Sequence, residues 1–134
     1  MRNNASQSLA LERIEDMLGS GFPDVMVKGE FLVPVELKAV IGYPARATTR
    51  VFGDDGLNQA QKNWWLDYSQ RSGRGLIVCS VGGGNSAHHY AIEGRHAQEF
   101  NNMNRHDLRN YAGVTCAGSA FWPLLWKYIR GMQS

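Results

Sequence analysis

The stretch DVMVKGEFLVPVELKAV, residues 24–40, decides the fold of this chain. Val25 and Val27 alternate as in a strand with one buried face, and the tripeptide Lys28-Gly29-Glu30 has the composition of a tight turn. An apolar run then continues to Val40. We therefore expect a β-hairpin over these residues.

The segments that follow the hairpin predict an α/β fold with a mixed sheet. Residues 41–56 are rich in Gly, Pro and Asp, which indicates a long loop, and the apolar spacing within residues 57–70 indicates a helix. The apolar run 76–81 predicts a buried strand, and residues 88–93, beyond a glycine turn, predict its partner. Residues 119–130 predict a closing helix.

Two segments leave their structure open. Residues 9–18 fit either a helix or a strand, and residues 95–110 are polar and ambiguous. The expected arrangement is a single domain over residues 1–134, with a central mixed β-sheet flanked by helices. Its core spans residues 11–93, and residues 95–134 form a C-terminal helical extension.

Length and composition exclude several classes of protein. The chain has 134 residues and a mass of 14.9 kDa, with 43% apolar and 19% charged residues, which is typical of one globular domain. No apolar run approaches the ~18 residues that span a bilayer, and Cys79 and Cys116 form no zinc motif or disulfide scaffold. We expect a reduced, cytoplasmic protein.

The formal net charge of +2 indicates no particular partner, but charge is uneven along the chain. Residues 1–37 carry three basic and six acidic residues, whereas residues 38–75 carry six basic and three acidic ones. This division suits a site that binds metal on one side and phosphate on the other. An ordinary mixed surface is the simpler explanation.

Asp24, Glu36 and Lys38 are the candidate chemical groups of the hairpin. Glu36 and Lys38 share one face of their strand, ~6.6 Å apart along it, and Asp24 opens the neighbouring strand. Two carboxylates so placed suit a hard cation such as Mg²⁺, and the Lys38 ammonium can contact a water or charge developing on phosphorus. A solvated strand face with an ion pair explains the same residues without chemistry.

Gln61 lies among the apolar residues of the predicted helix, at helical spacing from Leu57 and Trp64. Its amide therefore faces the sheet, where a buried polar group needs partners. Two roles fit this position. Gln61 can complete a capping box with Asn58 as the N-cap, or its amide can orient Lys38 or a catalytic water.

Four short motifs in this order resemble the PD-(D/E)xK nuclease superfamily, and within it the small VRR-NUC-type nuclease domains of phages and their hosts. The likeness covers residues 13–81. The resemblance also favours a strand over residues 11–16, with Glu15 facing the site as a further metal ligand. The motifs are Arg13-Ile14-Glu15, Gly21-Phe22-Pro23-Asp24-Val25, Val35-Glu36-Leu37-Lys38 and Gln61-Lys62-Asn63-Trp64-Trp65-Leu66.

The resemblance implies a restriction-endonuclease-like core and Mg²⁺-dependent cleavage of DNA, with Mn²⁺ able to substitute. It implies that Asp24 and Glu36 hold the metal and that Lys38 and Gln61 complete the catalytic site. Pro34, two residues before the motif carboxylate, is unexpected in a central strand and indicates either a bulge or the true start of the strand.

Four further residues are candidates for contacts with DNA. Arg46, Arg50 and Lys62 are expected to bind phosphates with a salt-sensitive affinity. Trp65 lies off the main apolar face of the predicted helix, so we expect it to stack on bases, with Trp64 in the core.

Other functions remain open from the sequence. A catalytically silent DNA-binding or regulatory phage protein would use the same fold without turnover. A structural α/β domain would bind another protein through its aromatic C-terminal segment. Junction, flap, nick and duplex cutters share this kind of site, so the preferred DNA structure is also open.

The closing helix predicts a homodimer. Its apolar residues surround the predicted helix, so a single packing face cannot bury them all. A two-fold dimer hides them and places two active sites for paired cuts in DNA. A deep slot within one monomer is the alternative. These residues are Phe121, Trp122, Leu124, Leu125, Trp126, Tyr128 and Ile129.

Overall fold

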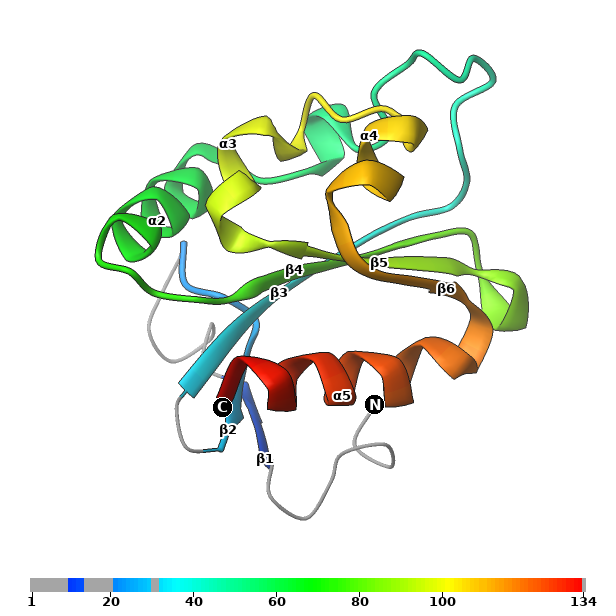
Figure 1. Ribbon diagram of the computed structural model, residues 1–134. Helices are drawn as coiled ribbons and strands as arrows, with labels where there is room; N and C mark the ends of the chain where they lie inside the picture. Colours follow the sequence, from blue (N-terminus) through cyan, green and yellow to red (C-terminus); the bar gives the residue numbers. More distant parts are fainter. Residues whose placement is uncertain (1–9, 14–20, 30–31, 134) are drawn as a thin grey trace.

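A computed structural model describes residues 10–13, 21–29 and 32–133, and these form a six-stranded sheet with helices on both faces (Figure 1). The strands lie side by side in chain order, and β3 and β4 are parallel whereas the other neighbouring pairs are antiparallel. The strands are β1 (Ala10–Arg13), β2 (Val25–Lys28), β3 (Leu32–Val40), β4 (Leu76–Val81), β5 (His88–Glu93) and β6 (Ala112–Ala117). The α/β fold with a mixed sheet is therefore confirmed.

Helices α2, α3 and α4 cover one face of the sheet, and α5 covers the other (Figure 1). The helices are α2 (Gln59–Gln70), α3 (Ala97–Phe100), α4 (Arg105–Tyr111) and α5 (Phe121–Gln133). Each face has its own apolar core. The core under α2 includes Trp65 and Phe100, and the core under α5 includes Val35 and Ile129.

The predicted hairpin is confirmed: β2 and β3 pair in antiparallel register, with Val25 opposite Val35. Pro34 lies inside β3 without a bulge in this register. Pairing of β3 with β4 begins only at Val35, so the missing N–H of Pro34 removes no hydrogen bond from that ladder. The strand begins at Leu32.

The predicted helical extension over residues 95–134 is wrong for residues 112–117, which form β6 at the edge of the sheet. The segment AGVTCA is rich in small residues that have little intrinsic strand preference. Its strand structure depends on pairing with β5 and on contact with α5, both distant in sequence. Residues 95–110 hold α3 and α4, which the sequence left open.

The closing helix is confirmed as α5, and its packing face on the sheet buries only some of its apolar residues, as expected. Phe121, Leu125, Trp126 and Ile129 are all buried, because α5 lies along the sheet over several turns (Figure 1). Leu124 remains 45% exposed. A homodimer stays a prediction, which sedimentation of the full-length protein measures. Among the described residues, no helix has the length and apolar character needed to cross a membrane.

Candidate active site

Asp24 lies at the entry to β2, where the chain passes close to α2. Gly21 has a φ of +93°, and a Cβ at this position would lie 3.0 Å from the carbonyl oxygen of Ala60 in α2. Only glycine suits both the backbone conformation and this close approach. The Asp24 Oδ2 atom then accepts a hydrogen bond from the backbone N–H of Leu37, with 2.7 Å between the heavy atoms. This bond fastens the Asp24 carboxylate to β3.

The structure brings Asp24 and Glu36 onto one face of the sheet. The hairpin ladder ends at the pair of Val25 with Val35, and the hairpin register continued by one residue sets Asp24, just before β2, opposite Glu36. Residues opposite each other in an antiparallel pair point to the same face. This is the face that α2 covers, because the alternate residues Val33 and Val35 belong to the core under α5.

Glu36 is buried, with only 1% of its surface exposed, and Gln61 of α2 binds it. The Gln61 Nε2 atom donates to Glu36 Oε2 at 3.2 Å, while Gln61 Oε1 accepts from the backbone N–H of Asn58 at 3.0 Å. Asn58 Oδ1 in turn accepts from the backbone N–H of Gln61 at 2.9 Å. The predicted capping box is therefore confirmed, and it fixes which end of the amide faces Glu36. A role of the amide in orienting Lys38 or a catalytic water stays a prediction.

Lys38 follows Glu36 by two residues, so its side chain leaves the same face of β3. It is half-buried, and its backbone lies beside Cys79 of β4. The salt bridges within the described part of the chain do not include its ammonium. Asp24, Glu36, Lys38 and Gln61 thus come from three adjoining elements on one side of the sheet.

The carboxylate pair suits Mg²⁺, which takes one or two protein carboxylates and keeps several waters. Within residues 10–13, 21–29 and 32–133, no group of three His, Cys, Asp or Glu side chains is placed to hold a metal ion. Glu15, the further predicted ligand, lies outside the described residues. The described donors are therefore Asp24 and Glu36, both of them hard oxygen ligands.

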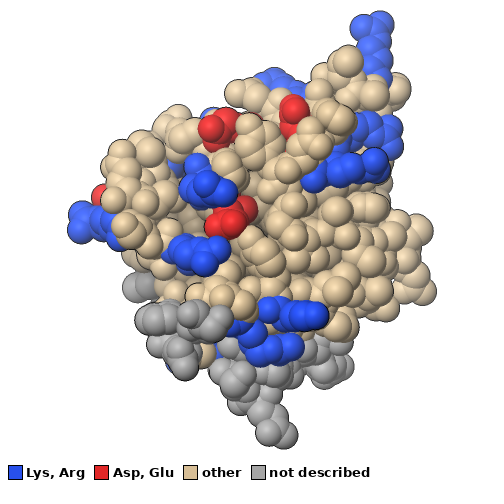
Figure 2. All heavy atoms as spheres, in the orientation of Figure 1, with Lys and Arg blue, Asp and Glu red and all other residues tan. Residues whose placement is uncertain are grey.

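The predicted phosphate-binding residues lie on the α2 side of the sheet. Arg46 and Arg50 are exposed in the long loop between β3 and α2, and Lys62 is half-buried on α2 (Figure 1). One guanidinium nitrogen of Arg50 lies 3.9 Å from the carboxylate of Asp54. Figure 2 shows that basic side chains of this view also gather at the upper right, over α4 and this loop.

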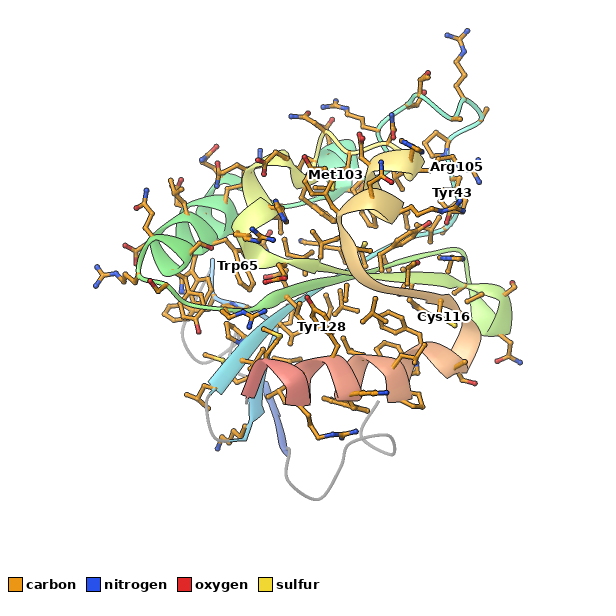
Figure 3. All side chains as sticks on the ribbon, viewed as in Figure 1. Tyr43, Trp65, Met103, Arg105, Cys116 and Tyr128 are labelled. Atoms are coloured by element: carbon orange, nitrogen blue, oxygen red, sulfur yellow. The ribbon has the colours of Figure 1, made fainter. Side chains whose placement is uncertain are left out.

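The expectation that Trp65 stacks on bases is wrong for this structure, since its side chain is completely buried between α2 and the sheet (Figure 3). A Cβ at Gly94 would lie 2.2 Å from the indole, and one at Gly75 would lie 2.6 Å from it. The ring therefore occupies space that two glycines leave free. Trp64, the predicted core residue, is the more exposed of the two.

The structure adds a tyrosine pair that no sequence motif contained. Tyr43, just beyond β3, and Tyr90 of β5 share a hydrogen bond between their hydroxyls. The guanidinium of Arg105, from α4, lies 4.2 Å from the centre of the Tyr43 ring. These residues come from three separate segments, so no local spacing in the sequence indicates that they meet.

Comparison of the chain with protein-family models, with curated proteins and with solved structures found no match.

Proposed function

We propose that this protein is a metal-dependent endodeoxyribonuclease with a restriction-endonuclease-like core. The observation that carries the proposal is a buried Glu36 that accepts from Gln61, with the Asp24 carboxylate bonded to the neighbouring Leu37 N–H and Lys38 on the same strand face. Burial of a carboxylate is costly unless it is compensated, and clusters of this kind are typical of functional sites.

Asp24 and Glu36 would hold Mg²⁺, which when bound lowers the pKa of its water and neutralises phosphate charge. Water would add to phosphorus and give up a proton to the solvent, while the bond to the leaving oxygen breaks and that oxygen takes up a proton, so that one strand end keeps the phosphate. Lys38 donates hydrogen bonds to the charge that develops on the phosphoryl oxygens. Gln61 is a positioning residue, because its Nε2 contact is with the Glu36 carboxylate.

The arrangement of elements also supports the proposal. The Glu36-Leu37-Lys38 motif lies inside β3, and the helix that follows, α2, carries Gln61 in its first turn. A parallel strand, β4, then lies directly beside β3. This is the order that the nuclease resemblance requires for the motifs to meet.

The test is cleavage of labelled plasmid, duplex, nicked, flap and four-way junction DNA with Mg²⁺ or Mn²⁺. We expect cleavage of at least one substrate by the wild-type protein and none by Asp24→Asn or Glu36→Gln. Both substitutions keep the size of the side chain and one acceptor oxygen but remove its charge. DNA binding by the wild-type chain without cleavage of any substrate would favour the silent DNA-binding alternative.

A further inference from the structure

A basic pocket lies between the loop that follows β3, the start of β5 and helix α4. It has a volume of about 370 Å³. Figure 3 shows Tyr43 and Arg105 at this place, at the upper right of the view. The side chains that carry the argument are Tyr43, His88, Tyr90, Arg105, His106 and Arg109.

The pocket is positively charged without compensation from its own walls. Among the residues that the structure describes, its lining contains no Asp or Glu, and no described salt bridge includes Arg105 or Arg109. Asp107 lies on the same helix, but its carboxylate accepts from the backbone N–H of Asn104 at 3.1 Å as part of the helix cap. The two arginines are four residues apart and so lie on one side of α4.

The field of these cations acts on His88. Burial lowers the pKa of His88 first, and the nearby charge of Arg109 lowers it further. The His88 Nε2 atom lies 2.9 Å from the hydroxyl of Thr115, which itself donates to the carbonyl of His89 at 3.0 Å. That hydroxyl therefore accepts from His88, whose ring is held with a fixed orientation. A bound anion would relieve the repulsion between these groups.

The pocket is also rigid at its centre. Burial raises the pKa of Tyr90, so its hydroxyl stays protonated and hydrogen-bonded to Tyr43. Arg105 stacks on Tyr43 and is thereby held in place before any ligand arrives. An arginine held in this way loses little conformational entropy when its guanidinium binds an anion.

The sheet register places this pocket close to the proposed active site. Lys38 pairs with Cys79, and Cys79 pairs with Tyr90, so the three residues form one row across β3, β4 and β5. Two strand spacings separate Lys38 from Tyr90, which is ~10 Å. Measured along the axis of a DNA duplex, that span covers roughly three base pairs, at ~3.4 Å each.

We propose that this pocket binds a backbone phosphate of the DNA strand whose scissile phosphate lies at Lys38. The inference rests on the proposed nuclease function and extends it: the pocket sets the register of the substrate. Arg105 and Arg109 supply bidentate donors to the phosphate oxygens, and His106 adds a further N–H donor, whereas the N–H of His88 already donates to Thr115.

The test is DNA affinity measured by fluorescence anisotropy in EDTA, so that cleavage does not occur, between about 50 and 200 mM salt. For the double variant Arg105→Ala/Arg109→Ala we expect the affinity for DNA to be at least about tenfold weaker. The slope of log affinity against log salt should also become shallower, by an amount that corresponds to the loss of about two phosphate contacts. The matched control is Lys127→Ala/Arg130→Ala, which removes the same charge from exposed positions of α5 on the opposite face. We expect this control to keep the wild-type slope.

A second variant protects the test against misfolding. Arg105→Lys/Arg109→Lys keeps the charge but loses the planar fork, so we expect the slope to return while affinity recovers only in part. An alanine variant with the wild-type salt slope would overturn the proposal. The proposal would also be overturned if the wild-type protein and the alanine variant bound DNA with equal affinity and inorganic phosphate displaced DNA from neither of them. If the wild-type protein cleaves DNA and the alanine variant binds DNA normally, the phosphate-binding role of the pocket is refuted and the nuclease function is kept. If the wild-type protein binds DNA through the pocket but cleaves no substrate, the nuclease function is refuted and the pocket is kept.

Discussion

The two faces of the sheet carry different kinds of residue, although the same strands supply both. Against α5, side chains such as Val35 and Val78 pack on Ile129 in an apolar core. Against α2, the same strand β3 presents Glu36 and Lys38 beside a second apolar core. The charged groups are therefore held within packed structure and not at a loose surface.

This difference shows what each face contributes. Val35 and Glu36 are neighbours in sequence, but alternation along the strand puts them in opposite environments. An apolar side chain in place of Glu36 would avoid the cost of removing a carboxylate from water. Stability alone therefore gives no reason for the charge under α2, whereas it explains the apolar residues under α5.

The largest effect is expected for Lys38→Ala, which should abolish measurable cleavage or lower its rate by about 10²–10³-fold. The reason is that Lys38 contacts charge present only in the transition state, so DNA and metal binding should change little. Single-turnover cleavage and anisotropy measure the two quantities. Lys127→Ala, on the α5 side, removes the same charge and should cut at the wild-type rate. Cleavage at the wild-type rate by Lys38→Ala would show that Lys38 does not stabilise the charge of the transition state.

For Ile129→Ala we expect a loss of stability instead of a direct effect on catalysis. This residue is fully buried under α5, so its truncation should lower the free energy of unfolding by ~2–5 kcal/mol. Urea denaturation followed by fluorescence measures it. Leu124→Ala removes the same kind of side chain from a position that is 45% exposed, and it should cost less than about 1 kcal/mol. Equal losses for the two variants would contradict the assignment of stability to this face.

Glu36→Gln separates stability from chemistry at one residue. The amide can still accept from Gln61 Nε2, and a buried charge is removed, so the free energy of unfolding should stay within about 1 kcal/mol or rise. Cleavage should be lost, because an amide is a poor ligand for Mg²⁺ compared with a carboxylate. A large loss of stability would mean that the Glu36 charge has a structural role.

The sequence predicted the elements whose signals are local. The hairpin, β4 and the side-by-side placement of Glu36 and Lys38 all follow from alternation within a few residues. The buried face of α2 differs from the expectation by one residue, since Trp65 is buried and Trp64 is half-buried. Asn58 is the N-cap, so Leu57 lies before the helix, and the buried positions are Gln61 and Trp65.

The remaining errors concern contacts between distant segments. Trp65 is buried because its ring fits over Gly75 and Gly94, and no spacing within α2 indicates this. The pocket around Tyr43 and Arg105 depends on the position of α4, whose segment is polar and gave no clear periodicity.

The smallest effects are expected for variants of the two helix N-caps, one of which lies beside the proposed active site. α2 and α4 begin with the same capping box, Asn58 with Gln61 and Asn104 with Asp107. Removal of either cap, as Asn58→Ala or Asn104→Ala, should cost ~1 kcal/mol of unfolding free energy. Only at α2 does the capping partner also bind a proposed metal ligand, since Gln61 Nε2 donates to Glu36.

The two cap variants should therefore separate in kinetics despite similar stability. Asn58→Ala keeps the bond from the backbone N–H of residue 58 to Gln61 Oε1 but removes the acceptor of the Gln61 backbone N–H. The first turn of α2, which holds the Gln61 amide against Glu36, therefore loosens, and kcat should fall several-fold with KM little changed. Asn104→Ala loosens the first turn of α4, which carries Arg105, so it should raise KM or weaken DNA binding while kcat is kept. Steady-state cleavage, with urea denaturation to match stabilities, makes the comparison. Identical kinetic changes in both variants would mean that the caps act only through stability, and that the amide of Gln61 does not position Glu36 for the reaction.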